Sequence, residues 1–305
     1  MSQSNAPIAL LTERRYAANT AAPDDWYLGN ILRDENLLIA ALAELGIAAE
    51  RVDWSRADVD WSVYPLAVFR TTWDYFDRFA EFAPWLARVR TVTRLCNDAR
   101  LIHWNMDKHY LADLEARGIP VVPSRFIERG TTLRLRELLD ETDWHNAVIK
   151  PCVSGGARYT YRVNRENAAE VQATVQPLLA TEAFLVQPFV PSIMTVGEDS
   201  LMVFGGRYSH AIRKIAKPGD FRVQDDHGGR AHAYEPTSAQ IELSERAIAA
   251  CDPRPVYGRV DLVADESSGW SIMELELIEP ELWLRYHPES ATAFARAIAD
   301  SLGRE

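Results

Sequence analysis

The sequence predicts a chain of mixed α and β structure that is divided into several packed units. Residues 1–95 alternate short apolar runs with a stretch of helical periodicity, which is typical of a small parallel α/β unit. Further along, a glycine-containing loop joins two strands near residue 155, and a strand hairpin at residues 257–281 carries several acidic side chains. A chain of 305 residues is long enough for two or three such units.

The N-terminal unit follows from its apolar patterning. Residues 8–11 form a short buried strand, and apolar residues recur on one face of a helix over residues 30–45, before a stop at Gly46. Residues 47–52 and 66–69 are the next strands. Strand, helix and strand in this order imply a parallel sheet.

A polar and aromatic cluster follows the last of these strands. Arg70, Trp73 and Asp74 stand at the end of the sheet where open α/β folds bind ligands. We therefore expect them to bind substrate. The alternative is a loop anchored by its tryptophan, in which Arg70 and Asp74 are simply paired with each other.

The next elements connect the N-terminal unit to the rest of the chain. A helix at residues 79–89 and a strand at residues 92–96 are followed by one long predicted helix at residues 97–117. Residues 120–127 are extended. Pro123 argues against a central position in a sheet, because proline cannot donate a ladder hydrogen bond.

A lysine and a glycine-containing loop form the first candidate for phosphate binding. Lys150 ends a strand, and Ser154, Gly155 and Gly156 follow before a second strand near residue 159. Glycines let backbone N–H groups approach an anion closely, and a lysine supplies a point charge. The loop is not a P-loop, since it lacks the GxxxxGK[ST] pattern and a strand follows it. Taken alone, such a loop is weak evidence for phosphate binding, because most loops of this kind are only turns.

The second half of the chain leaves backbone groups available to a flat ligand. The apolar strand at residues 184–188 ends at Pro188, and a segment that leaves its sheet at a proline has free amide and carbonyl groups for a heterocycle such as adenine. A strand at residues 201–204 turns back into a strand at residues 208–215, and the loop at residues 219–229 follows. Helices at residues 238–250 and 288–302 are also predicted.

Three carboxylates identify the hairpin at residues 257–281 as a candidate metal site. Glu274 and Glu276 share one face of their strand because side chains alternate, and the neighbouring strand can place Asp261 beside them. Oxygen ligands without histidine or cysteine favour magnesium, usually shared with nucleotide phosphates. A solvated acidic face paired with arginine or lysine explains the same pattern equally well.

Composition restricts the class of protein. The net charge of −11 argues against a broad nucleic-acid surface. The three cysteines are odd in number and widely spaced, which predicts a reducing cytoplasm and no disulfide framework. We find no signal peptide and no apolar run that would span a membrane. We expect a cytoplasmic globular protein, and leave open whether it forms a homo-oligomer.

The order of these parts resembles the ATP-grasp superfamily, and within it the carboxylate–amine ligases built like prokaryotic glutathione synthetase. The resemblance covers essentially the whole chain and implies an α/β (α+β) ATP-grasp fold, in which an N-terminal preATP-grasp domain precedes two subdomains that clamp ATP. Phrases at residues 70–75, 197–201, 209–214 and 221–229 resemble the O-ureido-D-serine cyclo-ligase group of cycloserine biosynthesis. The implied division is residues 1–95, 96–182 and 183–305.

The resemblance implies a role for each matching position. ATP and Mg²⁺ are the expected cofactors, with two magnesium ions and with Mn²⁺ as a substitute. Asp261, Glu274 and Glu276 would hold the metal. The catalytic residues would be Arg213, which would steady the acyl phosphate and the tetrahedral oxyanion, and Lys150, which would contact the ATP phosphates. The nucleotide-binding residues would be Lys108, Lys150, Ser154, Gly155, Gly156, Gln187, Phe189, Val190 and Glu198.

The implied substrate is a small molecule similar to an amino acid. Its carboxylate would be phosphorylated by ATP, and an amine or an internal nucleophile would then displace phosphate to form an amide bond. The substrate contacts would be Arg70, Trp73, Asp74, Arg222, His227 and Gly228. His227 either orients substrate or caps its loop. Cys152, next to the glycine loop, is interpreted as a packing residue.

Two departures from glutathione synthetase limit the transfer of roles. Glu276 stands where that enzyme has an asparagine, and Glu279 and Pro280 stand where many relatives have a Ser-Pro pair. Three functions follow as hypotheses. The first is a ligase that cyclises an O-ureido-serine-type compound, the second is an intermolecular amino-acid or dipeptide ligase, and the third is an ATP-binding protein without turnover.

Overall fold

The N-terminal unit is the predicted parallel sheet. A computed structural model describes residues 6–223, 228–265 and 269–303. Its first sheet has the order β2-β1-β3-β4, and all its pairings are parallel. The bounds of these strands are β1 Ile8–Thr12, β2 Ala49–Asp53, β3 Leu66–Thr71 and β4 Arg94–Cys96.

Two helices flank this sheet. Helix α1 (Trp26–Glu44) begins four residues before the predicted start, because the Asp25 side chain accepts a hydrogen bond from the backbone N–H of Leu28 and caps the helix there. Helix α2 (Phe79–Val89) has the predicted bounds. The short 3-10 helices of the chain are η1 Arg14–Tyr16, η2 Trp61–Val63, η3 Leu178–Ala180 and η5 Leu284–Tyr286.

The predicted single helix at residues 97–117 is wrong. The chain forms α3 (Ala99–Asn105) and α4 (Tyr110–Ala116), separated by a turn that contains Lys108. In this turn the backbone N–H of Lys108 donates to the carbonyl of Cys152 (2.9 Å), so a contact with a distant segment replaces a bond within the helix. The apolar spacing continues across the turn, which is why the sequence pattern did not reveal it.

The second sheet carries Lys150 and the glycine loop. Its strands are β5 (Arg125–Ile127), β6 (Asn146–Pro151), β7 (Tyr161–Asn164) and β8 (Phe184–Pro188), in the antiparallel order β5-β8-β6-β7. Strand β5 lies at the edge, as Pro123 predicted. Helices α5 (Leu135–Thr142) and α6 (Ala168–Val175) contribute to its core, and α5 was not predicted because it is short and mostly polar.

The third sheet carries the acidic hairpin. Its order is β11-β10-β9-β12-β13, and every pairing is antiparallel. The strands are β9 Glu198–Phe204, β10 Arg207–Ile215, β11 Arg230–Tyr234, β12 Tyr257–Asp265 and β13 Gly269–Glu276, and the helices that accompany them are α7 Ser192–Thr195, α8 Ser238–Ala249 and α9 Ser290–Leu302. The hairpin is as predicted, whereas β11 was not. The turn predicted at residues 266–269 lies largely outside the described residues.

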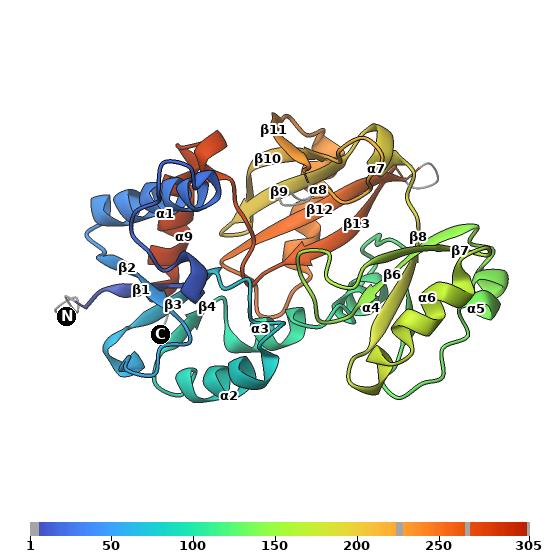
Figure 1. The fold of residues 1–305 in the computed structure, drawn as a ribbon. Coiled ribbons are helices and arrows are strands. Elements are labelled where there is room, and N and C mark those ends of the chain that lie inside the picture. The colour runs from blue at the N-terminus through green and yellow to red at the C-terminus, as the bar shows by residue number, and fades with distance from the viewer. Residues whose placement is uncertain (1–5, 224–227, 266–268, 304–305) are drawn as a thin grey trace.

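The last helix returns to the first unit. Figure 1 shows α9 beside α1, with the sheet of β5 to β8 at the opposite end of the molecule. One apolar core joins Leu38 and Leu42 of α1 to Phe294 and Ile298 of α9 and extends to Tyr257 of β12. The Tyr257 hydroxyl lies 2.7 Å from the carbonyl oxygen of Ile278 and 2.9 Å from that of Phe69, which fixes the third sheet against the first.

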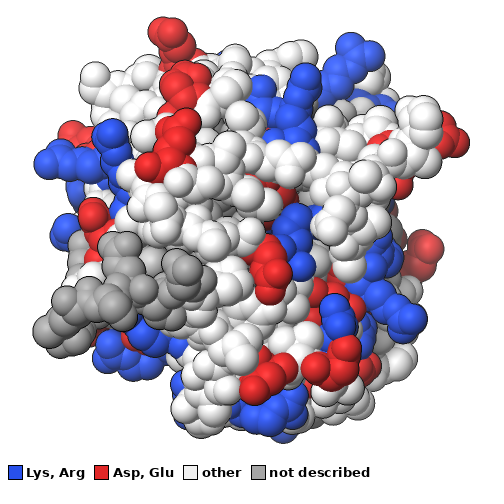
Figure 2. All heavy atoms as spheres, turned by 90° about the vertical axis from the view of Figure 1, so that its left-hand side faces the viewer, with Lys and Arg blue, Asp and Glu red and all other residues white. Residues whose placement is uncertain are grey.

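The surface of the N-terminal side is mixed in charge. In Figure 2, lysine and arginine side chains are interspersed with aspartate and glutamate over this face. Within the described chain, no helix is both long enough and apolar enough to cross a membrane.

Candidate active site

A cavity of about 660 Å³ lies where the three units meet. Its wall is made by residues from the N-terminal unit, the turn between α3 and α4, the glycine loop, the end of β8 and the acidic hairpin. Each of these segments contains residues that the sequence had marked. The fold therefore collects into one place groups that are far apart along the chain.

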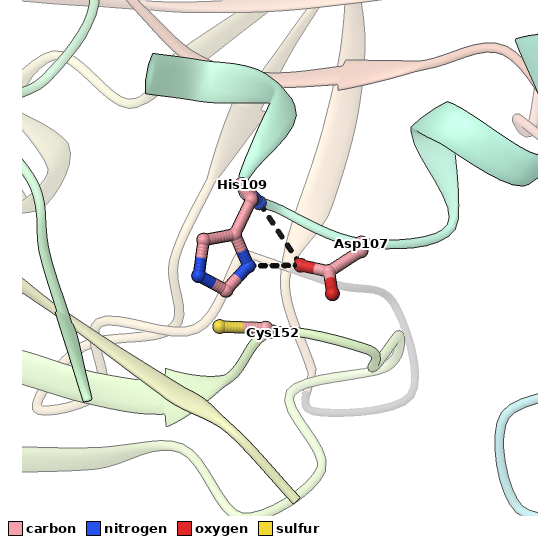
Figure 3. A group of neighbouring side chains, drawn as sticks. All are labelled: Asp107, His109 and Cys152. Atoms are coloured by element: carbon pink, nitrogen blue, oxygen red, sulfur yellow. Dashed lines mark hydrogen bonds and ion pairs between the residues drawn. The ribbon is translucent and has the colours of Figure 1, made fainter. Parts of the chain in front are cut away.

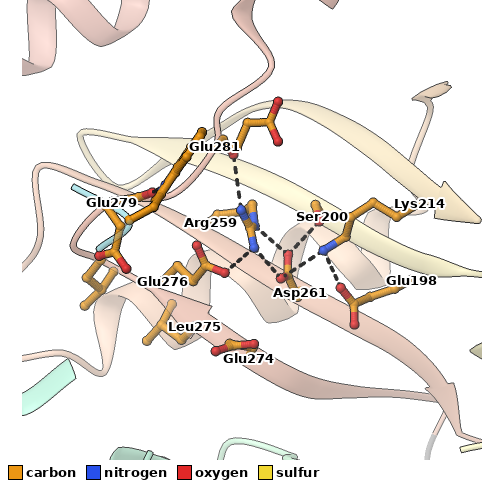
Figure 4. A network of polar contacts seen from close by, with 12 residues as sticks. Glu198, Ser200, Lys214, Arg259, Asp261, Glu274, Leu275, Glu276, Glu279 and Glu281 are labelled. Atoms are coloured by element: carbon orange, nitrogen blue, oxygen red, sulfur yellow. Dashed lines mark hydrogen bonds and ion pairs between the residues drawn. The ribbon is translucent and has the colours of Figure 1, made fainter. Parts of the chain in front are cut away.

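The three predicted metal ligands converge on this cavity. Asp261 lies opposite Glu274 in the register of β12 and β13, and one carboxylate oxygen from each of Asp261, Glu274 and Glu276 lies within 4.8 Å of the others. Leu275 between them is turned into the core and is 1% exposed. Figure 4 shows the three carboxylates on one face of the hairpin. This oxygen-only set fits magnesium.

Cations surround these carboxylates and set their ionisation. Lys108 Nζ lies 2.9 Å from Glu274, and Lys214 Nζ lies 3.2 Å from Asp261. Arg259 pairs with Asp261 at 2.8 Å and also contacts Glu276. Figure 4 shows Arg259 and Lys214 reaching Asp261 from two sides.

The pKa values follow from this arrangement. Burial alone would raise the pKa of both Asp261 and Glu274. Arg259 and Lys214 instead hold the pKa of Asp261 below its usual value. Lys108 and Lys150 lower the pKa of Glu274 in the same way. For Glu276, burial and the two neighbouring carboxylates outweigh Arg259 and raise its pKa. Asp261 and Glu274 are therefore ionised at neutral pH, as metal binding requires.

Among the cations of the described cavity wall, Lys150 is the one whose side chain makes no hydrogen bond or ion pair. It is the penultimate residue of β6 and lines the cavity, and no hydrogen bond or ion pair joins its ammonium group to any other described residue. Burial, together with the charge of Lys108, lowers its pKa. A half-buried, unpaired ammonium group in a cavity wall suits an anionic ligand such as a phosphate group.

The glycine loop covers one side of the cavity, as predicted. Ser154, Gly155 and Gly156 all line it, and the Ser154 carbonyl accepts a hydrogen bond from Lys108 Nζ (2.7 Å). A Cβ atom at Gly155 would lie 2.7 Å from the ring of Phe76, so glycine permits close contact with the N-terminal unit. Gly156 has a φ of +57°, which also favours glycine.

The residues predicted to hold adenine and ribose also line the cavity. Gln187, Phe189 and Val190 stand where the chain leaves β8, and the guanidinium of Arg162 lies 4.1 Å from the Phe189 ring centroid. Glu198 is the first residue of β9, not part of the loop before it, and its carboxylate contacts Lys214.

Arg213 does not line the cavity. Its guanidinium makes two hydrogen bonds to Asp199 (2.6 and 2.9 Å) and lies 4.0 Å from the Tyr234 ring centroid. Successive side chains of a strand point to opposite faces, so the next residue, Lys214, faces the cavity instead.

Arg259 is the arginine at this site, and the sequence reasoning missed it. It lines the cavity, lies over the ring of Trp283 at 5.2 Å and pairs with two of the acidic residues. A signal was present, because residues two apart in a strand share a face and Arg259 stands two positions before Asp261.

Of the N-terminal cluster, only Trp73 reaches the cavity. Arg70 is 3% exposed and pairs with Glu35 of α1 at 2.9 Å. Asp74 accepts hydrogen bonds from Trp54 (2.8 Å) and Arg78 (2.8 Å). Neither belongs to the cavity wall, and they are not paired with each other either.

An aromatic corner beside Trp73 was also missed. Tyr16 and Tyr27 line the cavity, with ring centroids 5.6 and 6.2 Å from that of Trp73, and the Trp73 indole N–H donates to the Glu279 carbonyl (2.8 Å). Tyr16 ends η1 and Tyr27 lies in the first turn of α1, before the start predicted for this helix, so neither tyrosine gave a signal.

The loop at residues 219–229 contributes in part. Arg222 lines the cavity and pairs with Asp220 at 2.7 Å. Gly228 has a φ of +83° and is not part of the wall, and a Cβ atom there would lie 3.3 Å from the Lys217 side chain. His227 lies outside the described residues.

A second group of potential ligands lies at the base of the glycine loop. Asp107, His109 and Cys152 each place one ligand atom within 4.8 Å of the others (Figure 3). The His109 ring is already hydrogen-bonded through Nδ1 to Asp107 (2.5 Å) and through Nε2 to Glu128 (3.1 Å). Burial raises the pKa of the Cys152 thiol, and Cys152 belongs to an apolar core. We interpret the group as a support for the turn that carries Lys108.

Comparisons with known proteins cover both halves of this site. The family model for the N-terminal domain of D-cycloserine synthetase DcsG matches residues 8–97. The family model for the ATP-grasp domain of prokaryotic glutathione synthetase matches residues 120–253. Cycloserine biosynthesis protein DcsG of Streptomyces lavendulae is 35% identical over 285 residues, which cover 87% of this chain and 92% of that protein.

Solved structures agree with these sequence matches. The crystal structure of D-cycloserine synthetase DcsG has a TM-score of 0.85 and 34% identity, covering 97% of this chain and 99% of that one. D-alanine–D-alanine ligase from Bacillus anthracis has a TM-score of 0.65 at 14% identity, with 97% of each chain covered. At this lower identity the likeness shows the fold alone.

Proposed function

The chain belongs to the ATP-grasp ligases and, within them, to the group of cycloserine biosynthesis protein DcsG, and from this we propose that it closes the ring of an O-ureido-serine-type substrate. The family confirms the fold and the C–N bond-forming ligase activity predicted from the sequence. The observation that supports ring closure is the match to the DcsG structure at 34% identity, which covers 97% of the chain and includes the N-terminal unit.

ATP binding follows from the family, and the geometry supports specific roles. Lys108 and Lys150 hold the phosphates under the glycine loop, the backbone at residues 187–190 holds adenine, and Glu198 binds the ribose. Asp261, Glu274 and Glu276 would hold Mg²⁺, and a bound ion would supply positive charge next to the transferring phosphoryl group. We propose two ions, because three carboxylates in one cluster exceed what a single magnesium bound to phosphates uses. Mn²⁺ accepts the same ligands and would substitute.

The proposed reaction then proceeds in three steps. The substrate carboxylate attacks the γ-phosphorus of ATP, and the acyl phosphate and ADP form. The ureido-oxy nitrogen attacks the acyl carbon, a C–N bond forms, and phosphate leaves with the C–O bonding pair while the nitrogen loses its proton. Water removes the carbamoyl group as carbon dioxide and ammonia. We assign to Arg259, in place of Arg213, the stabilisation of the developing oxyanion, because it lines the cavity beside the carboxylates.

Phosphate release with ATP and Mg²⁺ tests this proposal. O-ureido-D-serine is added alone, then amino acids singly and in pairs, and products are identified by mass spectrometry. Turnover with the single substrate and loss of a small fragment is the expected result. Release only with pairs of amino acids would establish an intermolecular ligase instead, and ADP binding without any release would indicate a protein that has lost turnover.

A further inference from the structure

We infer that the substrate end of the cavity holds a subsite for the α-ammonium group of an amino acid, formed by Glu279 and the aromatic corner of Tyr16, Tyr27 and Trp73. This inference rests on the proposed function, because it names the chemical group by which the same site selects its substrate. It assigns to Glu279 a role in binding, separate from the metal ligands.

Glu279 is the one carboxylate of the described cavity wall that has no counter-ion. Its side chain makes no hydrogen bond or ion pair to any other described residue, although it lines the cavity. Every other carboxylate in the wall is paired with a cation: Asp77 with Arg158, Glu198 with Lys214, Asp261 and Glu276 with Arg259, Glu274 with Lys108, and Glu281 with Arg285. A cation from the ligand is therefore the missing partner.

The aromatic corner favours the same kind of ligand. The ring centroids of Tyr16, Tyr27 and Trp73 lie between 5.6 and 6.2 Å from one another. Ring faces attract ammonium groups and offer nothing to a carboxylate. Because the Trp73 indole N–H donates to the Glu279 carbonyl (2.8 Å), the corner is fixed to the residue that supplies the negative charge.

The nearby arginine does not reverse this preference. Arg15 lines the cavity, but its guanidinium lies 2.5 Å from the buried carboxylate of Glu13 and 5.2 Å from the Tyr16 ring centroid. Its charge is therefore balanced within the protein. The remaining carboxyl group at this end of the cavity is that of Glu279. Burial and the neighbouring Glu276 raise its pKa well above the usual value, and a bound ammonium group would supply the cation that favours its ionised form.

The position of Glu279 relative to the metal ligands selects the α-ammonium group. Glu279 follows Glu276 by three residues, and the two carboxylates lie on the same side of Arg259 while Glu281 lies on the other (Figure 4). A substrate carboxylate that reaches the phosphoryl group near Glu276 has its α-nitrogen two bonds away. The subsite therefore admits α-amino acids and discriminates against carboxylic acids without the ammonium group.

The test compares O-ureido-D-serine with its des-amino analogue, 3-(ureidooxy)propanoate, by phosphate release. We expect the wild-type protein to prefer the amino compound in kcat/KM. Glu279→Gln keeps the shape but removes the charge, and should lower kcat/KM for the amino compound about 10- to 100-fold while leaving the analogue unaffected. Trp73→Leu should reduce the preference in the same direction. Equal kcat/KM values for the two compounds in the wild type, or a preference that survives in Glu279→Gln, would overturn the inference.

Glu281→Gln is the matched control. It removes a carboxylate from the same segment, but one already neutralised by Arg285 at 2.6 Å, so the preference should change less than threefold. ADP and Mg²⁺ binding by calorimetry shows for each variant that the nucleotide site is intact. An equal loss of preference in Glu281→Gln would mean that the preference depends on the total negative charge of this segment, which contradicts the specific role of Glu279.

The outcome remains decisive if neither compound is turned over. That result would refute the proposed ring closure, and saturation-transfer NMR with the protein, ADP and Mg²⁺ would then test the subsite alone. Binding of the amino compound but not of the analogue, lost in Glu279→Gln, supports the subsite independently. Equal binding of both, or of neither, rejects it.

Discussion

Arg259 and Arg213 show how the partners of one side chain decide its role. Both lie on the third sheet and both form bidentate pairs with an aspartate, Asp261 and Asp199 respectively. Only Arg259 lines the cavity. Residue type and a nearby carboxylate therefore do not identify the functional arginine. The face of the strand on which the arginine lies identifies it.

Matched substitutions separate these two arginines. We expect Arg259→Met to lower kcat about 100-fold or more, because it removes a positive charge from the reacting centre. Arg213→Met should keep kcat within tenfold and mainly lower stability, since it leaves the buried Asp199 without its cation. Steady-state phosphate release and urea unfolding distinguish the two. A folded Arg213→Met protein without turnover would contradict the assignment.

Lys150 makes a different prediction because it has no partner to lose. Its side chain is half-buried and its ammonium group makes no ion pair within the described residues. Burial lowers its pKa, so Lys150→Met removes a charge that is unfavourable in the protein without ligand. We expect the free energy of unfolding without nucleotide to rise by about 1 kcal/mol, while ADP affinity falls at least tenfold. Urea unfolding and calorimetry measure the two quantities. A variant less stable than the wild type would indicate a structural role instead.

His210 predicts how stability depends on pH. Burial lowers its pKa from 6.5 to about 4 and outweighs the hydrogen bond between Nε2 and the Leu282 carbonyl (2.7 Å), which alone would raise it, so the folded state keeps the ring neutral. Between pH 6.5 and pH 4 the unfolded chain binds a proton that the folded state does not, so stability is lost as the pH falls. The loss from this group is about 2 kcal/mol at pH 5.

The measurement is urea unfolding at pH 7 and pH 5. In His210→Gln, which cannot titrate, the difference in free energy of unfolding between the two pH values should be smaller than in the wild type by that amount. The comparison uses the pH difference within each protein, so any packing cost of the substitution cancels. Identical pH differences in both proteins would refute the assignment.

At the scale of elements, alternation in strands was the most informative signal. It placed Asp261, Glu274 and Glu276 on one face of a hairpin, and the structure agrees. The two-helix arrangement around Lys108 was not predictable, because it depends on a hydrogen bond to Cys152, which is distant in sequence. The choice between Arg213 and Lys214 required the register of β10, since neighbouring residues in a strand face opposite sides. Periodicity thus predicts a face within an element, whereas the cavity depends on contacts between elements.

The entry to β9 makes a prediction about glycine. Gly197 has a φ of +100°, and a Cβ atom there would lie 2.3 Å from the backbone oxygen of Lys214. Gly197→Ala should therefore destabilise the protein by about 3 kcal/mol or more. Gly46→Ala is the control, because its φ is +74° but nothing lies within 4 Å, so it should cost only about 1 kcal/mol. Similar losses in urea unfolding would show that the clash is relieved.

At the scale of the whole molecule, the cavity predicts coupling between ligand binding and stability. Its wall includes all three units, so a nucleotide held there contacts segments that must be folded together. At a concentration 100 times its Kd, ADP with Mg²⁺ should stabilise the protein by about 2.7 kcal/mol. Thermal unfolding with and without EDTA measures the metal's share. An unchanged Tm after chelation would contradict the acidic cluster as the metal site.

The packing of α9 against α1 restricts which segments can be exchanged between such ligases in order to change their substrate specificity. The pair encloses one core, and Arg285 just before α9 also binds Asp34 of α1 at 2.6 Å. A chimera that replaced only residues 1–97 would set Phe294 and Ile298 of the retained α9 against a foreign α1. The two segments that must be exchanged together are therefore separated in the gene. A functional chimera needs one crossover after β4 and a second before η5. Libraries built with a single crossover would return mostly misfolded proteins, whatever the compatibility of their active sites.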